Sequence, residues 1–168
     1  MPGALIQIVN EQDEPIGQAI KQEAWRQGLI TRIVRVIAIN ADGKILLQKR
    51  SSRLPLYPNC WSESISGHVD VGETYLAAAK RELSEELGIN HVELQEIDYF
   101  RSSGNFEGLK LERFSKVYKF IFPEKHFKLQ KSEVAQVHWF DVPTIRIMMA
   151  QHPEDFVIDF HRVVDSIL

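Results

Sequence analysis

Four glutamates and one arginine stand at fixed offsets between residues 73 and 86: Glu73, Arg81, Glu82, Glu85 and Glu86. The last three glutamates occupy positions i, i+3 and i+4, so on a helix their side chains share one face. Like charges this close repel one another, whereas clustered hard oxygen ligands are what Mg²⁺ or Mn²⁺ requires. The pattern therefore predicts a divalent-metal site with positions left for water and phosphate oxygens. We expect Arg81 to orient the carboxylates, because Glu85 follows at i+4 and Glu73 lies within reach.

The segment that carries these carboxylates has the composition of a helix. Residues 74–87 are rich in Ala, Leu, Glu, Lys and Arg and contain no Gly or Pro. Gly88 suits the left-handed position just after a helix C-terminus. A separate apolar stripe is predicted to pack on the core, and it consists of Leu76, Ala79, Leu83 and Leu87.

The spacing of the whole segment is more specific than its composition. It reads Gly67, five residues, Glu73, seven residues, Arg81-Glu82-Leu83, one residue, Glu85-Glu86, one residue, Gly88-Ile89. This resembles the full signature of the Nudix family, GX5EX7REUXEEXGU with U a bulky apolar residue, and every specified position is filled. A chance match in a chain of this length has odds on the order of 10⁻⁸ from average residue usage. The resemblance implies an α/β/α sandwich and metal-dependent hydrolysis of a diphosphate bond.

The bulk properties indicate one domain spanning residues 1–168. The chain is 44% apolar and 26% charged, with a net charge of −3, so it offers no overall attraction for nucleic acid or acidic membranes. It has no apolar run of eighteen residues and no signal peptide, so we expect a cytoplasmic location. Cys60, the single cysteine, rules out an internal disulfide and is expected to be a small buried residue.

The remaining elements predict an α/β fold with a mixed sheet between helices. Short helices are expected over residues 20–27 and from Pro143 and Pro153 onward. A turn is expected at the Ser-Ser-Gly-Asn of residues 102–105. The last strand is apolar enough to be internal. The predicted strands cover residues 4–9, 33–39, 44–48, 61–66, 92–101, 113–122 and 134–140.

For the hydrolase reading, Glu82, Glu85 and Glu86 hold one or more Mg²⁺ or Mn²⁺ ions, and the backbone carbonyl near Gly67 is a further ligand. Glu85 is the first choice for the general base that activates water. Two other carboxylates, Glu112 and Glu133, are outside candidates, and for both a solvated position is favoured.

Several side chains near the signature are candidate substrate contacts. Arg50 can grip phosphate oxygens in a bidentate way, with Lys49 beside it, although a solvated strand end is equally consistent. His68 follows the signature glycine and is expected to contact the substrate or support the metal ligands. Three aromatic residues can stack a base but are more often core, namely Tyr57, Trp61 and Phe100.

Residues from about 5 to 140 also resemble the Nudix subgroup that contains type 1 isopentenyl-diphosphate isomerase and its hydrolase relatives. The shared pieces are Ile16-Gly17, residues 46–51, Tyr57-Pro58 with Trp61, and Gly67-His68. Two chemistries are therefore open. One is hydrolysis of a diphosphate, and the other is isomerisation of an allylic double bond by proton transfer.

Three departures favour hydrolysis. The isomerase needs a cysteine before the Gly-His pair, and this chain has Ser66, whose hydroxyl is too weak an acid. Two upstream metal-binding histidines of the isomerase align with Trp25 and Thr31, and an indole has no lone pair for a metal. A pair of acids aligns with Leu111 and Arg113. The glutamate between them would point to the opposite face of a strand.

The predicted substrate is a nucleoside diphosphate linked to another group, or a related organic diphosphate. A third hypothesis is a non-catalytic module that senses a nucleotide. Such modules commonly lose a carboxylate of the signature, and this chain keeps them all. The leaving group, the number of metal ions and the oligomeric state stay open. An apolar N-terminal strand or C-terminal helix would suit a homodimer.

Overall fold

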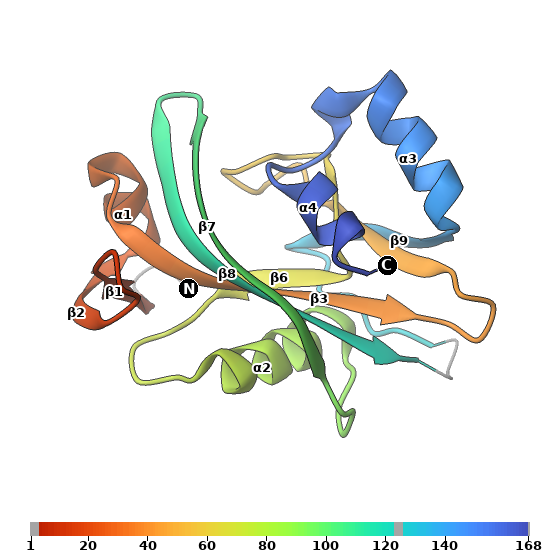
Figure 1. The fold of residues 1–168 in the computed structure, drawn as a ribbon, viewed down its shortest axis with the longest axis horizontal. Coiled ribbons are helices and arrows are strands. Elements are labelled where there is room, and N and C mark those ends of the chain that lie inside the picture. Colours follow the sequence, from red (N-terminus) through yellow and green to blue (C-terminus); the bar gives the residue numbers. More distant parts are fainter. Residues whose placement is uncertain (1–3, 123–125, 168) are drawn as a thin grey trace.

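The computed structural model describes residues 4–122 and 126–167, and in this part of the chain nine strands join in one mixed sheet (Figure 1). The strands are β1 (Leu5–Val9), β2 (Pro15–Ile20), β3 (Ile30–Ile39), β4 (Ile45–Arg50), β5 (Trp61–Ser62), β6 (Ile65–His68), β7 (Gln95–Phe106), β8 (Leu109–Ile121) and β9 (Val134–Phe140). The helices are α1 (Lys21–Gln27), α2 (Tyr75–Leu87), α3 (Val142–Gln151) and α4 (Phe160–Asp165), with a 3-10 turn η1 (Pro153–Asp155). Within these residues no helix is long and apolar enough to cross a membrane.

Strand β3 is the centre of the sheet. Its sequence is mostly apolar, and the residues from Ile33 to Ala38 are all buried, as expected for a strand covered on both faces. It pairs antiparallel with β1, β4 and β6, and parallel with β8 along its full length. The parallel pairing with β8 is what makes the sheet mixed.

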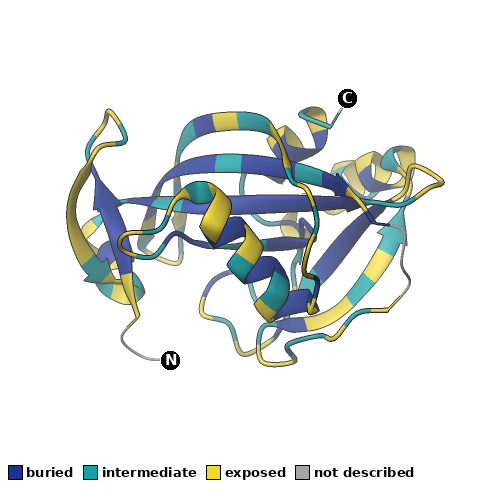
Figure 2. Ribbon diagram, turned by 90° about the horizontal axis from the view of Figure 1, so that it is seen from below, coloured by how far each residue is buried: buried dark blue, intermediate teal, exposed yellow. Residues whose placement is uncertain are grey.

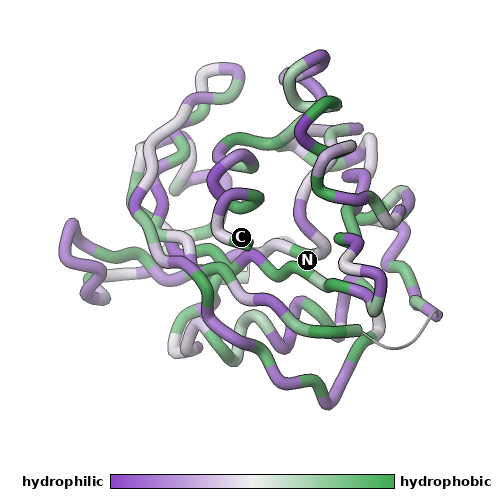
Figure 3. Tube along the Cα trace, turned by 45° about the vertical axis from the view of Figure 1, so that its right-hand side comes forward, coloured by the Kyte–Doolittle hydropathy of each residue, from purple (hydrophilic) through white to green (hydrophobic). Residues whose placement is uncertain are grey.

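Helices cover both faces of the sheet, which confirms the predicted α/β/α sandwich. Figure 1 shows α2 below the sheet and α3 and α4 above it. The lower core joins Val34 and Val36 of β3 to Leu83 and Leu87 of α2. The upper core contains Ile37, Leu47, Val117, Ile145, Phe160 and Val163. The central strands β3 and β4 are largely buried, whereas hydrophobic and hydrophilic residues alternate along much of the chain outside them (Figures 2 and 3).

Helix α2 begins and ends where its sequence predicts. The side chain of Thr74 accepts a hydrogen bond from the backbone N–H of Ala77 at 3.1 Å, and Gly88 ends the helix with φ 68°. The predicted apolar stripe is wrong at Leu76, which is 41% exposed. Leu76 lies in the first turn beside a surface groove, and the buried side of the helix is formed by Ala78, Ala79, Leu83 and Leu87.

The turn predicted at residues 102–105 is wrong, because β7 runs straight through these residues to Phe106. The hairpin turns instead at Glu107 and Gly108, which both have positive φ. A side chain on Gly104 would come within 2.0 Å of Ile158 Cδ1. This glycine therefore marks a close approach of the C-terminal segment rather than a turn.

The strand predicted over residues 61–66 is divided in two, with β5 paired to β4 and β6 paired to β3. Between them the Ser64 hydroxyl donates to the Leu46 carbonyl at 2.6 Å and accepts from the Ala38 N–H at 2.8 Å. The chain crosses from one strand to the other at this point. As a result Gly67 and His68 lie beside the central strand.

Three other expectations at the periphery need correction. Strand β9, expected to be internal, pairs with β4 alone among the described strands and is mostly exposed or half-buried. Cys60, expected to be buried, is half-buried. The helix expected from Pro153 is interrupted, because η1 is followed by an extended Phe156 before α4 begins.

Two leucines of α2, one buried and one exposed, give a matched test of this packing. Leu83→Ala should lower the free energy of unfolding by about 2–5 kcal/mol, because it leaves a cavity under the sheet. Leu76→Ala should change it by less than about 1 kcal/mol, because Leu76 is already exposed to water. Urea denaturation of both variants measures the difference. Equal losses of unfolding free energy would show that Leu76 is packed as tightly as Leu83.

Candidate active site

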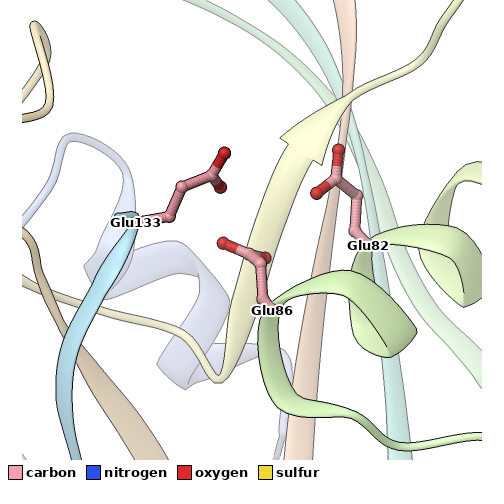
Figure 4. A group of neighbouring side chains, drawn as sticks. All are labelled: Glu82, Glu86 and Glu133. Atoms are coloured by element: carbon pink, nitrogen blue, oxygen red, sulfur yellow. The ribbon is translucent and has the colours of Figure 1, made fainter. Parts of the chain in front are cut away.

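Three carboxylates meet where α2 approaches the start of β9 (Figure 4). One oxygen each from Glu82, Glu86 and Glu133 lies within 4.8 Å of the others. We call these residues the carboxylate trio. Glu133 is held in place by a turn, because the Gln130 N–H donates to the Glu86 carbonyl at 3.0 Å and the Glu133 N–H donates to the Gln130 carbonyl at 2.9 Å. The same helix that supplies two members of the trio therefore positions the third.

Glu85 lies apart from the trio. Its side chain is 49% exposed and accepts a hydrogen bond from Arg81 Nη1 at 3.3 Å. On a helix, Glu82 and Glu86 are about 40° apart in projection, whereas Glu85 is displaced from Glu86 by about 100°. The prediction of one shared face therefore holds for Glu82 and Glu86, while Glu85 occupies the rim of the same cavity.

Burial leaves the trio short of positive charge. Desolvation raises the pKa of Glu82 to about 7, against the lowering effect of Arg81. Desolvation also raises the pKa of Glu86 well above its usual value, and the neighbouring Glu82 and Glu133 add to this shift. One oxygen of Glu86 is buried without a hydrogen-bond partner within the described residues. Clustered carboxylate oxygens with an unmet demand for positive charge are the donor set that a hard divalent cation fits.

Gly67 leaves the space through which Glu82 reaches this cluster. A Cβ at residue 67 would lie 2.2 Å from Glu82 Cδ, closer than any real contact. The backbone φ of Gly67 is not in the left-handed region, so the glycine is required here for space rather than for conformation. The role of its carbonyl as a metal ligand stays a prediction.

Arg81 joins the carboxylates into one network, as its spacing predicts. Its guanidinium binds Glu73 in a bidentate way at 2.8 and 2.9 Å and donates to Glu82 at 2.8 Å. It also donates to the His68 carbonyl at 3.0 Å. Hydrogen bonds from Arg81 lower the pKa of Glu73, and the bond to Glu73 raises the pKa of Arg81. Glu73 therefore anchors Arg81, and Arg81 orients Glu82 and Glu85.

The trio opens into a cavity of about 620 Å³, whose lining includes Arg50 and His68. Arg50 donates from Nε and Nη2 to the Leu56 carbonyl at 3.0 and 2.8 Å, so it also holds the loop after β4. Burial lowers the pKa of Arg50, while the nearby Glu86 opposes this effect. His68 is buried beside Trp25, with ring centroids 5.8 Å apart, and desolvation keeps its pKa well below the usual value.

Lys49 was grouped with Arg50 by the sequence, but it does not line the cavity. Its ammonium lies 5.6 Å from the ring centroid of Trp61. Successive residues of a strand point to opposite faces, which separates Lys49 from Arg50. The structure therefore does not bring Lys49 and Arg50 together in the cavity, and a contact of Lys49 with substrate stays a prediction.

The two outside candidates have opposite outcomes. Glu133, for which a solvated position was favoured, is half-buried and belongs to the trio. Glu112 accepts hydrogen bonds from Arg101 and Ser103 at 2.8 and 2.6 Å and lies outside the cavity. The neighbouring Arg113 lines the cavity instead. The sequence signal for Glu133 was weak, because only the packing of the segment before β9 against α2 brings it to the site.

The aromatic candidates divide between core and cavity. Phe100 is 6% exposed and belongs to the upper core. Trp61 is half-buried and packs edge-on against Phe140. Tyr57 lines the cavity and packs against Phe106. Of the three aromatic residues, Tyr57 alone can contact a ligand bound there.

Known proteins resemble this chain along most of its length. A family model for the NUDIX domain matches residues 29–160. An uncharacterized Nudix hydrolase of Nostoc sp. is 40% identical over 98 residues, which make up 56% of this chain and 58% of that protein. An isopentenyl-diphosphate Delta-isomerase of Burkholderia multivorans is 30% identical over 159 residues, 94% of this chain and 89% of the relative.

A crystal structure of a Deinococcus radiodurans protein shares the fold, with a TM-score of 0.79 and 24% identity. The match covers 96% of this chain and 97% of that one. The complete signature, the sandwich fold and the family match agree, and the chain belongs to the Nudix hydrolase family.

Proposed function

We propose that this protein hydrolyses a diphosphate bond with the help of a divalent cation. The substrate is a nucleoside diphosphate linked to another group, or a related organic diphosphate. The observation that carries the proposal is the carboxylate trio, because three carboxylates within 4.8 Å, two of them with raised pKa values, call for a cation. The adjoining cavity of about 620 Å³ is of the size that holds small-molecule ligands.

Glu82, Glu86 and Glu133 would hold the cation, with Glu85 and the carbonyl of Gly67 as further ligands. Mg²⁺ or Mn²⁺ bound there would neutralise phosphate charge and polarise water. The protein's own part is to keep these carboxylates close together in spite of their repulsion. It does so through Arg81 and through the buried position of the helix.

Glu85 is our candidate for the general base. It lies at the rim of the cavity, and its carboxylate is half exposed and therefore accessible to a water molecule. It takes a proton from the water whose oxygen attacks phosphorus, and the bond to the leaving phosphate oxygen breaks. Arg81 fixes the direction of the Glu85 side chain through their hydrogen bond.

Isomerisation of isopentenyl diphosphate is the alternative that the isomerase relatives favour. The cavity lacks the groups for that chemistry at the aligned positions. Ser66 and Trp25 line it in place of a cysteine and a histidine. The Ser66 hydroxyl is too weak an acid to replace the cysteine as a proton donor near neutral pH. The Trp25 indole has no lone pair with which to replace the histidine as a metal ligand. A nucleotide sensor is less favoured, because all the carboxylates of the signature are retained.

A substrate screen tests the proposal directly. Purified protein with Mg²⁺ or Mn²⁺ should release a monophosphate from a member of a panel of dinucleotides, nucleotide sugars and organic diphosphates. The same preparation should convert no isopentenyl diphosphate to dimethylallyl diphosphate. Isomer formation would establish the alternative, and tight nucleotide binding without turnover at any metal concentration would establish a sensor.

Exchange of a single carboxylate tests the base. Glu85→Gln should lower kcat by a factor of about 10² or more, because the amide cannot accept the proton of water, and it should leave the melting temperature nearly unchanged. Glu93→Gln, at an exposed position outside the cavity, serves as the control. Full turnover in Glu85→Gln would show that Glu85 is not the base.

The raised pKa of Glu82 predicts how stability depends on pH. Folded Glu82 titrates near pH 7, whereas the unfolded residue titrates near 4.5, so between these values the folded state holds more protons and loses stability as pH rises. Without metal, the melting temperature of the wild-type protein minus that of Glu82→Gln should therefore fall by several degrees from pH 5 to pH 8. The conversion is about 2–4 °C per kcal/mol for a domain of this size. Both proteins contain His68, so its opposing titration cancels in the comparison. Thermal melts at both pH values measure the effect.

Adding Mn²⁺ at pH 8 should raise the melting temperature of the wild-type protein and raise that of Glu82→Gln much less. Parallel pH profiles and equal metal responses in the two proteins would exclude Glu82 from a cation site.

A further inference from the structure

Arg113 is a buried positive charge without a protein partner. Its side chain lies on β8 and is 8% exposed. Within residues 4–122 and 126–167, its guanidinium makes no hydrogen bond or ion pair, and of its three nitrogens Nε is fully covered and unsatisfied. A buried cation without a protein partner destabilises the folded state, because burial removes part of its hydration and no protein group replaces the lost water.

The other arginines that line the cavity are all bound by protein groups. Arg35 donates to the carboxylate of Glu63 at 3.3 Å and to the Ile158 carbonyl at 3.2 Å. Arg50 binds the Leu56 carbonyl, and Arg81 binds Glu73. Each of these three arginines thus has a protein partner, although Arg35 Nη2 makes no hydrogen bond within the described residues. Arg113 departs from that pattern while facing the same cavity.

Two other arginines add positive charge near Arg113, and one aspartate opposes them. Desolvation, followed by the like charge of Arg35, lowers its pKa to about 10, so it remains a cation at neutral pH. Arg50 lowers the pKa further, while Tyr57 and Asp159 act in the opposite direction. Asp159 already lies 3.7 Å from Arg35. An anionic ligand would supply the partner that Arg113 lacks.

The strand register separates Arg113 from the carboxylate trio. Arg113 pairs with Thr31 on one side of β3, and Gly67 pairs with Val34 on the other side. Three residues along β3 and two inter-strand spacings put the Cα atoms of Arg113 and Gly67 about 14 Å apart. Glu82 passes beside Gly67, so Arg113 approaches the cavity from a different strand and a different end.

We propose that Arg113 is an oxyanion subsite that binds a second anionic group of the substrate, a phosphate or a carboxylate, away from the diphosphate at the carboxylate trio. This rests on the proposed function in taking an organic diphosphate as the substrate. A guanidinium offers a phosphate or carboxylate two parallel hydrogen bonds, and Tyr57 lines the same cavity. A substrate without the second anion leaves this buried charge unpaired, which makes the subsite a determinant of specificity.

Binding of simple anions to the metal-free protein tests the subsite without requiring catalysis. In EDTA at constant ionic strength, the carboxylate trio repels anions, so bound anion reports the arginine end of the cavity. Isothermal titration calorimetry with inorganic phosphate, and separately with succinate, distinguishes a phosphate from a carboxylate as the preferred group. Arg113→Gln should weaken binding of the preferred anion about tenfold or more. Arg53→Gln, an exposed arginine outside the cavity, should leave it unchanged.

The melting temperature gives a second test. Replacing an arginine with a purely structural role would lower it, whereas replacing Arg113 should raise it. Arg113→Met should raise the melting temperature of the ligand-free protein by about 2–4 °C, because it removes an unpaired buried charge and keeps the aliphatic stem. Phosphate should raise the melting temperature of the wild-type protein and not that of Arg113→Met. A lower melting temperature in Arg113→Met, or equal phosphate binding by Arg113→Gln and wild type, would overturn the proposal.

These outcomes are separable from the fate of the proposed function. Arg113-dependent anion binding without any hydrolysis would leave the subsite standing and reject the hydrolase. Hydrolysis without Arg113-dependent anion binding would do the reverse.

Discussion

The active-site end of this molecule depends on two glutamates of α2 that are withdrawn from water while close to each other. Their carboxylates are costly to bury as charges, and the raised pKa values of Glu82 and Glu86 express that cost. The surrounding structure tolerates them through the guanidinium of Arg81 and the space at Gly67. A cation would supply the charge that is still missing. The arrangement that would bind a cation therefore lowers the stability of the ligand-free protein, and a bound cation would restore that stability.

The central strand explains why such a site exists at this place. β3 pairs with β6 on one side and β8 on the other, so Gly67 and Arg113 are both fixed relative to one rigid strand. The helix beneath the sheet contributes carboxylates at one end, and β8 contributes a cation at the other. Rigid elements thus carry opposite charges to two ends of one cavity. A ligand with anionic groups at both ends would match this arrangement once a cation is bound.

Local patterns predicted the elements that depend on local physics. The bounds of α2, the left-handed Gly88 and the network around Arg81 follow from spacing and composition, because helix periodicity fixes which side chains are neighbours. The sequence predictions were wrong where the position of a residue depends on the packing of segments far away in the chain. Gly104 was predicted to lie in a turn, but it lies in a strand and leaves space for the side chain of Ile158. Leu76 was predicted to pack on the core, but it is exposed. For the same reason Glu133, expected to be solvated, belongs to the carboxylate trio, and Lys49 lies beside Trp61 rather than in the cavity.

The sequence by itself determined the family chemistry, since the complete signature requires a helix with its carboxylates at set positions. Tertiary structure decided which carboxylates converge. It brought Glu133 to α2 from 47 residues beyond Glu86 in the chain and left Glu85 at the rim. It also decided that Arg113 faces the cavity without a partner. Such features depend on strand register and on the packing of segments far apart in sequence, and no local spacing encodes these.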